Sequence, residues 1–206
     1  MLGSGGHASV LVDILLQQQI AIAGIAGPGL KSLRKSLENI PCYQDSDLLS
    51  FKTEEILLIN GIGSIPGNSL RFDVYKKFIS LGYSFESVIA SSAIVSPHAI
   101  LASGVQVMQG AIIQAGAVIG ENTIINTGVI VEHNCIIGSN NHLAPGVTLS
   151  GEVESKNNVH FGTGASVIQS IQIGNNSVIG AGATVTKNVD DNEILYPARA
   201  TKKALK

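Results

Sequence analysis

Large apolar residues recur at every sixth position through the second half of the chain. The series begins at Val95 and continues without a gap to Leu149. Ser155 interrupts it, and it resumes from Phe161 to Val185 at the same spacing. An amphipathic helix repeats near 3.6 residues and a strand repeats at 2, so neither alone explains a period of six. This period predicts a parallel β-helix, in which each hexapeptide supplies one short strand and one corner.

A second set of positions supports the same interpretation. Four residues after most of the apolar positions stands a small or β-branched residue that fits a crowded corner. These residues are Ala99, Val105, Ala111, Ala117, Thr123, Val129, Cys135, Ala165, Ile171, Ser177 and Ala183. Three hexapeptides would close one triangular coil of about 18 residues, with the apolar position pointing inward. About five coils, stacked at the strand spacing of ~4.8 Å, would form a prism roughly 25 Å long.

The first 90 residues show other patterns. Residues 8–18 have apolar side chains at helical spacing, whereas the apolar runs 20–25 and 55–60 predict short buried parallel strands. The expected fold class is therefore a Rossmann-like α/β module followed by a parallel β-helix of hexapeptide repeats. We expect the module over residues 1–90, the β-helix over 91–189 and a C-terminal cap over 190–206.

A second helix is predicted over residues 71–81. Its apolar residues Phe72, Tyr75, Phe78 and Ile79 are spaced so as to share one face. Gly82 follows as a plausible stop.

Composition narrows the class of protein. The chain has 206 residues, 23 of them glycine, with 45% hydrophobic and only 14% charged residues. This hydrophobic content argues against intrinsic disorder. The 13 Lys+Arg against 15 Asp+Glu leave no basic surplus for a nucleic-acid partner. No apolar run reaches the roughly 18 residues that a membrane span requires.

The two cysteines and the N-terminus bear on the compartment. Cys42 and Cys135 lie far apart in dissimilar contexts, which predicts no disulfide framework. No basic stretch precedes an apolar one at the N-terminus, so no signal peptide is expected. The expected compartment is the cytoplasm.

Three segments together resemble a known family. They are the turn Gly3–Gly6 with His7, the segment Ile62-Gly63-Ser64 followed by Arg71, and the repeats up to Lys187. With them the chain resembles the hexapeptide-repeat acetyltransferases, in particular the nucleotide-4-amino-sugar N-acetyltransferases of the bacillosamine and perosamine type and the sialic acid O-acetyltransferases. The resemblance implies a left-handed β-helix, a homotrimer with active sites between neighbouring prisms, and acetyl-CoA as the acyl donor.

The resemblance also implies a reaction. We expect acetyl-CoA-dependent N-acetylation of the 4-amino group of a nucleotide-linked 4-amino-4,6-dideoxy sugar, in the biosynthesis of a surface glycan such as the lipopolysaccharide O-antigen. O-acetylation of sialic acid is the alternative within the same family. A non-catalytic β-helix scaffold and a dinucleotide-binding module are interpretations from other classes.

His133 is the candidate general base. It stands two residues after an inward position, Val131, so its ring is expected outside the core, and a neutral histidine suits proton removal at neutral pH. The resemblance implies the same role. Members of the family usually have a carboxylate directly after this histidine, where this chain has Asn134. Either Glu132 takes over its support, or the base is weaker. Asn126 is expected near the acceptor amine, or in an asparagine ladder inside the prism.

His142 is expected near the acetyl-CoA thioester. It stands half a coil after His133, so only a neighbouring subunit could bring the two together. His160 stands one full coil after His142 and should stack on it; we expect a solvent or interface histidine.

The resemblance implies further contacts to acetyl-CoA along the coils. The predicted residues are Gly151, Thr163, Ala181 and Lys187. Arg199 and Lys187 would meet the CoA phosphates or else be solvated charges. No metal is expected, because no cysteine or carboxylate stands at ligand spacing around the histidines.

The resemblance assigns the nucleotide-sugar diphosphate to the N-terminal turn. Gly5, Gly6 and His7 would bind it at a helix N-terminus, with Gly63 across the crevice. An NAD-binding fingerprint would need an acidic residue about 20 residues on, where the chain has Gly27-Pro28. The identity of the nucleotide therefore stays open.

Overall fold

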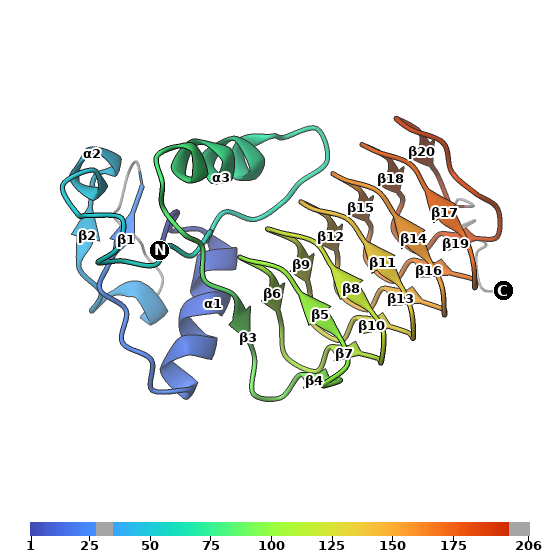
Figure 1. Cartoon of the computed structure of the whole chain (residues 1–206), viewed down its shortest axis with the longest axis horizontal. Coiled ribbons are helices and arrows are strands. Elements are labelled where there is room, and N and C mark those ends of the chain that lie inside the picture. Colours follow the sequence, from blue (N-terminus) through green and yellow to red (C-terminus); the bar gives the residue numbers. More distant parts are fainter. Residues whose placement is uncertain (28–34, 198–206) are drawn as a thin grey trace, which may run out of the picture.

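The computed structural model describes residues 1–27 and 35–197, and it shows a prism of short strands with an α/β module at one end (Figure 1). The hexapeptide period is confirmed, because a two-residue strand recurs every six residues. The strands of the prism are β3 (Val88–Ile89), β4 (Ile94–Val95), β5 (Ile100–Leu101), β6 (Gln106–Val107), β7 (Ile112–Ile113), β8 (Val118–Ile119), β9 (Ile124–Ile125), β10 (Ile130–Val131), β11 (Ile136–Ile137), β12 (His142–Leu143), β13 (Thr148–Leu149), β14 (Glu154–Ser155), β15 (His160–Phe161), β16 (Ser166–Val167), β17 (Gln172–Ile173), β18 (Val178–Ile179), β19 (Thr184–Val185) and β20 (Ile194–Leu195).

Each strand of the prism pairs with the strand one full coil, or three hexapeptides, later. Ile130 pairs in parallel with Thr148, and Thr148 pairs with Ser166. Three sheets result: a six-stranded one in the order β19-β16-β13-β10-β7-β4, a five-stranded one in the order β17-β14-β11-β8-β5, and a seven-stranded one in the order β20-β18-β15-β12-β9-β6-β3. We call the turns from the seven- to the six-stranded sheet corner A, those from the six- to the five-stranded sheet corner B, and those from the five- to the seven-stranded sheet corner C.

The apolar position of each hexapeptide faces the interior of the prism, as predicted. Val131 and Phe161 are fully buried, and so is the corner residue Cys135. Ser155, which breaks the apolar series, also lies inside, and its hydroxyl accepts a hydrogen bond of 2.8 Å from the side-chain amide of Asn141. A paired hydroxyl avoids the cost of an unsatisfied buried polar group.

One corner position has a left-handed backbone. From Gly104 to Gly182, the third residue after each apolar position has a φ between 54° and 76°. Glycine and asparagine occupy most of these places, because glycine lacks a Cβ and asparagine tolerates this conformation. Asn134 is one of them, with a φ of 57°. The backbone therefore favours an amide directly after His133.

The N-terminal module combines helices with very short parallel strands. Its elements are α1 (Gly6–Gln17), β1 (Ile25–Ala26), the 3-10 helix η1 (Lys35–Leu37), β2 (Cys42–Tyr43), α2 (Asp45–Leu48) and α3 (Leu70–Ser80). Leu2 forms parallel bridges to both Ala26 and Asn60, and Leu58 forms one to Phe85. The strand predicted over 20–25 is thus present only from Ile25, and the one over 55–60 is reduced to single bridges.

Helix α3 buries a different face from the one predicted. Tyr75 and Phe78 are buried as expected, but Phe72 and Ile79 are 36% and 43% exposed. Arg71 takes the inner position instead, because residues three and four apart share a helix face. Hydrophobic spacing alone could not indicate that a cation would be buried here.

The two ends of the prism depart from the regular coil. β3 pairs with β6, so the seven-stranded sheet begins a few residues before residue 91. β20 pairs with β18 over a shorter turn, because Val178 lies opposite Ile194 where a full coil would place Tyr196. The last part of the predicted cap, with Arg199, lies outside the described residues, and so does Pro28.

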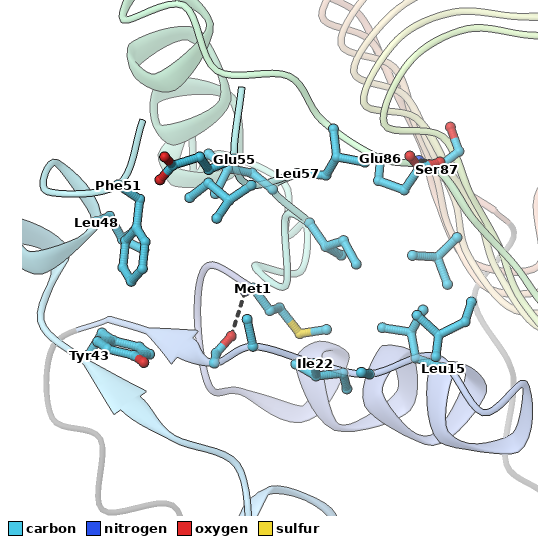
Figure 2. Close-up of a pocket in the computed structure, with 18 of the residues that line it drawn as sticks. Met1, Leu15, Ile22, Tyr43, Leu48, Phe51, Glu55, Leu57, Glu86 and Ser87 are labelled. Carbon is cyan, nitrogen blue, oxygen red and sulfur yellow. Dashed lines mark hydrogen bonds between the residues drawn. The ribbon is translucent and has the colours of Figure 1, made fainter. Parts of the chain in front are cut away.

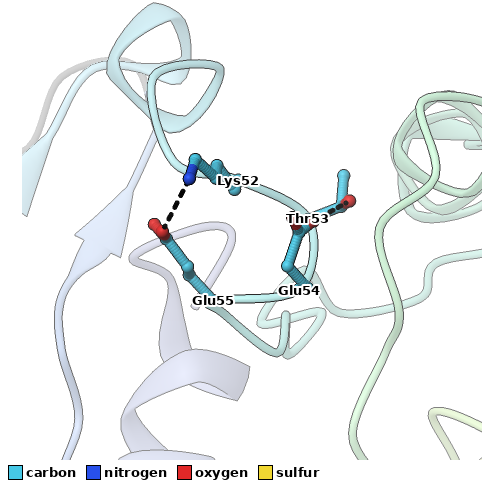
Figure 3. A network of polar contacts seen from close by, with 4 residues as sticks. All are labelled: Lys52, Thr53, Glu54 and Glu55. Atoms are coloured by element: carbon cyan, nitrogen blue, oxygen red, sulfur yellow. Dashed lines mark hydrogen bonds and ion pairs between the residues drawn. The ribbon is translucent and has the colours of Figure 1, made fainter.

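Surface charge pairs contribute little to this fold. Among residues 1–27 and 35–197 one ion pair occurs, between Lys52 Nζ and Glu55 Oε1 at 3.7 Å, in a surface loop of the module (Figure 3). Both side chains are mostly exposed, and such pairs are worth about 0–1 kcal/mol. Apolar packing and backbone pairing therefore dominate the stability of the chain.

Arg71 joins the module to the prism. Its guanidinium is buried and donates to the backbone carbonyls of Asn60 (2.9 Å) and Ile62 (2.6 Å) in the module. It also donates to the carbonyl of Asn122 (3.2 Å) and to Gln106 Oε1 (3.2 Å) in the prism. Oxygen acceptors from both parts thus surround one cation, and burial lowers its pKa to about 9, which still leaves it charged at neutral pH.

Two side-chain amides complete this contact. Gln106 Nε2 donates to the carbonyl of Asn60 (2.8 Å), and Asn60 Nδ2 donates to Asn122 Oδ1 (3.1 Å). His7 Nε2 lies 2.7 Å from Gln106 Oε1, an atom that can only accept, so His7 donates. The N-terminus of α1, the residues after Asn60 and the seven-stranded sheet are therefore linked by one hydrogen-bond network.

Replacement of Arg71 tests this network. Arg71→Ala leaves the carbonyls of Ile62 and Asn122 without their donor. It also removes one of two donors from the Asn60 carbonyl and from Gln106 Oε1, so we expect the free energy of unfolding to fall by about 2–4 kcal/mol. Urea unfolding of the full chain measures it. Lys76→Ala, on the exposed side of the same helix, should change stability by less than about 0.5 kcal/mol. Equal effects of the two substitutions would contradict the role of Arg71.

Candidate active site

His133 lies at corner B, just after β10, and is exposed as predicted. Its Nδ1 lies 3.2 Å from Asn134 Nδ2. Its ring also covers Gly151, one coil further on: a Cβ at Gly151 would lie 2.5 Å from both Cε1 and Nε2 of the ring. Gly151 thus provides the space in which the imidazole lies, a role that the sequence did not reveal.

Glu132 is the other candidate support of His133. It is half-buried beside the histidine, and among the described residues its carboxylate makes no hydrogen bond to the imidazole. Asn134 is the neighbour whose side chain contacts the ring. The geometry thus favours the amide over the carboxylate as the partner of His133.

A second group of polar residues lies outside the seven-stranded sheet, near corner A. His142 faces outward from β12, because its neighbour Leu143 faces the core, and the module covers it so that it is 9% exposed. Its Nε2 lies 3.2 Å from Asn126 Nδ2, and its Nδ1 lies 3.3 Å from His160 Nδ1. Asn126 therefore contacts His142 and does not belong to a ladder inside the prism.

The stacking of His160 on His142 is confirmed. Strands β12 and β15 pair these two residues directly, and the ring centroids are 4.8 Å apart at an interplanar angle of 73°. Burial, reinforced by His160, His7 and Arg71, lowers the pKa of His142 to about 3. The backbone carbonyl of Ser64 opposes this shift. Burial also lowers the pKa of His160. Both rings are therefore neutral at pH 7.

The residues predicted to contact acetyl-CoA fall into two columns along the prism. His133, Gly151 and Lys187 stand at corner B, with Gly151 one coil after His133 and Lys187 further along the same column. Thr163 and Ala181 stand at corner A, one coil apart, and both are exposed. The six-stranded sheet separates the two corners. One prism therefore does not bring His133 and His142 together, as the half-coil spacing predicts.

The predicted nucleotide residues meet at a crevice in the module. A cavity of about 360 Å³ is lined by Gly3, Gly5, Gly6, His7, Gly61, Ile62, Gly63, Ser64, Ile65 and Asn68. Helix α1 begins at Gly6 with Gly5 as its N-cap, so its N-terminal N–H groups lie at this cavity. Burial and the nearby Arg71 lower the pKa of His7 to about 4. The crevice thus offers backbone donors and a neutral histidine.

A larger apolar cavity lies elsewhere in the module. It measures about 490 Å³, and its wall includes Met1, Leu15, Ile22, Tyr43 and Phe51 (Figure 2). None of the predicted site residues lines it. The polar chemistry of the chain is concentrated at the crevice and along the prism instead.

The described part of the chain offers neither a cluster of metal-ligating side chains nor a membrane-spanning helix. In residues 1–27 and 35–197, no three His, Cys, Asp or Glu side chains lie close enough together to hold a metal ion. No helix within these ranges has the length and apolar character needed to cross a membrane.

Models of two hexapeptide families match the prism. The bacterial transferase hexapeptide (six repeats) matches residues 116–151, and the hexapeptide repeat of succinyl-transferase matches residues 157–187. None of the curated proteins compared with the chain matches it.

Solved structures resemble the chain over nearly its whole length. PerB from Caulobacter crescentus, in complex with CoA and GDP-perosamine, is 33% identical; the match covers 94% of this chain and 90% of that one, with a TM-score of 0.82. The acetyltransferase domain of PglB from Neisseria gonorrhoeae, in complex with acetyl coenzyme A, is 27% identical over 97% of each chain, with a TM-score of 0.82. WeeI from Acinetobacter baumannii shares the fold at 20% identity, 94% and 93% coverage and a TM-score of 0.81.

The chain belongs to the hexapeptide-repeat acetyltransferases. It is a CoA-dependent acetyltransferase whose co-substrate is acetyl-CoA. Similarity to a GDP-perosamine N-acetyltransferase supports a sugar N-acetyltransferase.

Several polar residues of this acetyltransferase had no predicted role. Gln106 and Asn60 are almost fully buried and hold His7 and Arg71 in place. The sequence gives a weak indication that Gln106 has a special role, because this polar residue stands at a strand position that is isoleucine in the next coil. The carbonyl of Ser64 faces His142 across the module boundary, which no sequence pattern could indicate.

Substitution of Gly151 tests whether catalysis by this acetyltransferase depends on the position of the His133 ring. A Cβ in Gly151→Ala would displace the imidazole, so we expect kcat to fall about tenfold to a hundredfold. Steady-state kinetics with acetyl-CoA, alongside thermal unfolding, measures the effect. Ser150→Ala, one residue earlier, adds no atom and should leave kcat within about twofold. Unchanged kcat in Gly151→Ala would show that the position of His133 does not matter.

Proposed function

We propose that this acetyltransferase transfers the acetyl group of acetyl-CoA to the 4-amino group of a nucleotide-linked 4-amino-4,6-dideoxy sugar. The observation that carries the proposal is an exposed histidine, His133, held over Gly151 in a chain 33% identical to a protein that binds CoA and GDP-perosamine. Structures of that enzyme also exist with a histidine replaced by alanine or asparagine. A surface glycan precursor is the kind of acceptor that we infer.

His133 acts as the general base in this proposal. The amine attacks the thioester carbonyl, a C–N bond forms, and His133 Nε2 takes the amine proton as the tetrahedral intermediate develops. The C–S bond then breaks, and the proton passes to the CoA thiolate. Nε2 is available only when Nδ1 carries the imidazole proton. Asn134 must therefore present Oδ1 to Nδ1, which a half-turn of its side-chain amide provides.

The module supplies the nucleotide site. The crevice beside Gly5, Gly6, His7 and Gly63 offers the N–H groups of a helix N-terminus, which favour a diphosphate. The network of Arg71 and Gln106 fixes this crevice relative to the seven-stranded sheet, where Asn126 would meet the amine. We infer a cytoplasmic enzyme, consistent with its unpaired exposed Cys42.

We also propose that the site is shared between copies of the chain in a homotrimer of left-handed prisms. His133, Gly151 and Lys187 stand at corner B, whereas His142, Asn126, Thr163 and Ala181 stand at or near corner A. A neighbouring prism would bring corner B of one copy to corner A of another. Isoleucines on the outside of the five-stranded sheet support association: Ile100 and Ile136 are 63% and 51% exposed and stack with Val118.

The activity is tested by thiol release from acetyl-CoA with UDP-, GDP- and dTDP-linked 4-amino sugars, beside free sialic acid. We expect turnover with one of the amino sugars and a loss of about 10²–10⁴-fold in kcat for His133→Ala. His98→Ala, at another exposed histidine of the prism, should leave kcat unchanged. Turnover of sialic acid alone would assign O-acetylation instead, and full activity of His133→Ala would refute the base.

The shared site predicts the assembly. Light scattering of the active protein should give about three times the mass of one chain. We expect this trimer because the outside of the five-stranded sheet is apolar and because one prism cannot complete the site. A stable monomer with full activity would contradict this prediction.

A further inference from the structure

The orientation of the Asn126 side chain is fixed by its own backbone neighbour. The N–H of Thr127 donates to Asn126 Oδ1 at 2.8 Å, and the Thr127 hydroxyl lies 3.4 Å from the same oxygen. A backbone N–H can only donate, so the atom that it meets must be the amide oxygen. The other atom of the amide, Nδ2, therefore faces His142.

This orientation decides which nitrogen of His142 is protonated. Asn126 Nδ2 lies 3.2 Å from His142 Nε2 and can only donate, so Nε2 must offer its lone pair. The low pKa of His142 keeps its ring neutral, so its single proton is on Nδ1. A neutral ring with the proton on Nδ1 is one of two tautomers, and here the neighbours select it.

His160 receives that proton as a hydrogen-bond acceptor. Its Nδ1 lies 3.3 Å from His142 Nδ1, and two facing nitrogens form a hydrogen bond only when one of them is unprotonated. Since His142 Nδ1 carries a proton, His160 Nδ1 offers the lone pair. His160 is also neutral, so its own proton is on Nε2, and the ring lines the groove between residues 64–72 and corner C.

We infer that Asn126, His142 and His160 form a hydrogen-bond relay of fixed polarity, in which His160 is the positioning residue that keeps the proton of His142 on Nδ1 and thereby leaves Nε2 to hold Asn126. The polarity runs from Asn126 to His142 to His160. In the proposed function, on which this consequence rests, the relay holds the amide of Asn126 in one orientation toward the reacting amine.

The relay also limits what His142 can do. Nε2 of His142 has no proton to give to a ligand while it accepts from Asn126. The Ser64 carbonyl and His160 Nδ1 are the acceptors that favour a proton on the ring of His142. His142 therefore acts through Asn126, and its stacked partner acts through His142.

The tautomers can be read directly in the full-length protein. Labelling with ¹⁵N-histidine and recording long-range ¹H–¹⁵N spectra at pH 7 distinguishes protonated from bare ring nitrogens. The chain has five histidines, and the signals of His142 and His160 are identified as those lost in His142→Gln and in His160→Gln. We expect the proton of His142 on Nδ1 and that of His160 on Nε2. A wild-type spectrum with the proton of His142 on Nε2 overturns the relay, whatever the enzyme acetylates.

Two variants test the positioning role of His160. His160→Leu removes the acceptor, so the proton of His142 should distribute over both nitrogens and kcat should fall about fivefold to tenfold, the change that corresponds to one lost hydrogen bond. KM for acetyl-CoA should stay within about twofold. His160→Gln retains an oxygen acceptor and should restore both the tautomer and most of kcat.

The two readouts separate this inference from the proposed function. If His160→Leu leaves the tautomer of His142 and kcat as in the wild type, His160 has no positioning role. If the tautomers change as expected but no amino sugar is acetylated, the relay stands and the proposed acceptor is wrong. His98→Ala, prepared in parallel, should alter neither readout.

Discussion

The full-coil register between successive strands of each sheet is the constraint on which the rest of this structure depends. Because each residue pairs with the one a coil later, side chains at equivalent places form straight columns along the prism. Such columns bring His160 onto His142 and place Gly151 under the ring of His133. The same register limits the chemistry of a single prism, because residues half a coil apart, such as His133 and His142, lie on different sides.

The contact between the module and the prism provides a concave site, which the columns of side chains along the prism do not form. A solenoid presents repeated surfaces, whereas a nucleotide-sugar site needs a concave pocket. Arg71 and Gln106 connect the pocket-forming residues after Asn60 to the outer side of the seven-stranded sheet. The buried guanidinium makes this contact polar and directional, so it fixes geometry as well as stability. His7 at the crevice and His142 on the prism become neutral partly because this cation lies near them.

The prism was predictable from sequence, because each hexapeptide repeats a local pattern that needs no knowledge of distant residues. Spacing also predicted that His133 lies outside the core and that His160 stacks on His142. It could not predict the inward turn of Arg71, which depends on carbonyls that only the folded module brings together. The sequence predicts longer strands in the module than the structure has. The reason is the same, because an apolar run forms a strand only where a partner strand lies beside it. The roles of His133 and Asn134, the hand of the coils and their assembly are still predictions.

The column geometry restricts how such a chain can change in length. Between His133 and Gly151 the chain tolerates no change in length, because the imidazole lies over Gly151 only at a spacing of one full turn. Elsewhere in the prism, removing or adding residues in anything but full turns would shift every later corner to another side. Whole turns could be added after Val185 without any such shift, and only the pairings of Ile173 with Val189 and of Val178 with Ile194 would pass to the added strands. The pairing of Val178 with Ile194 is shorter than a full coil, so the residues from Ile194 onward no longer stand at full-coil spacing. The length of the prism can therefore change only in complete turns, and the shorter last pairing ends the series of full coils.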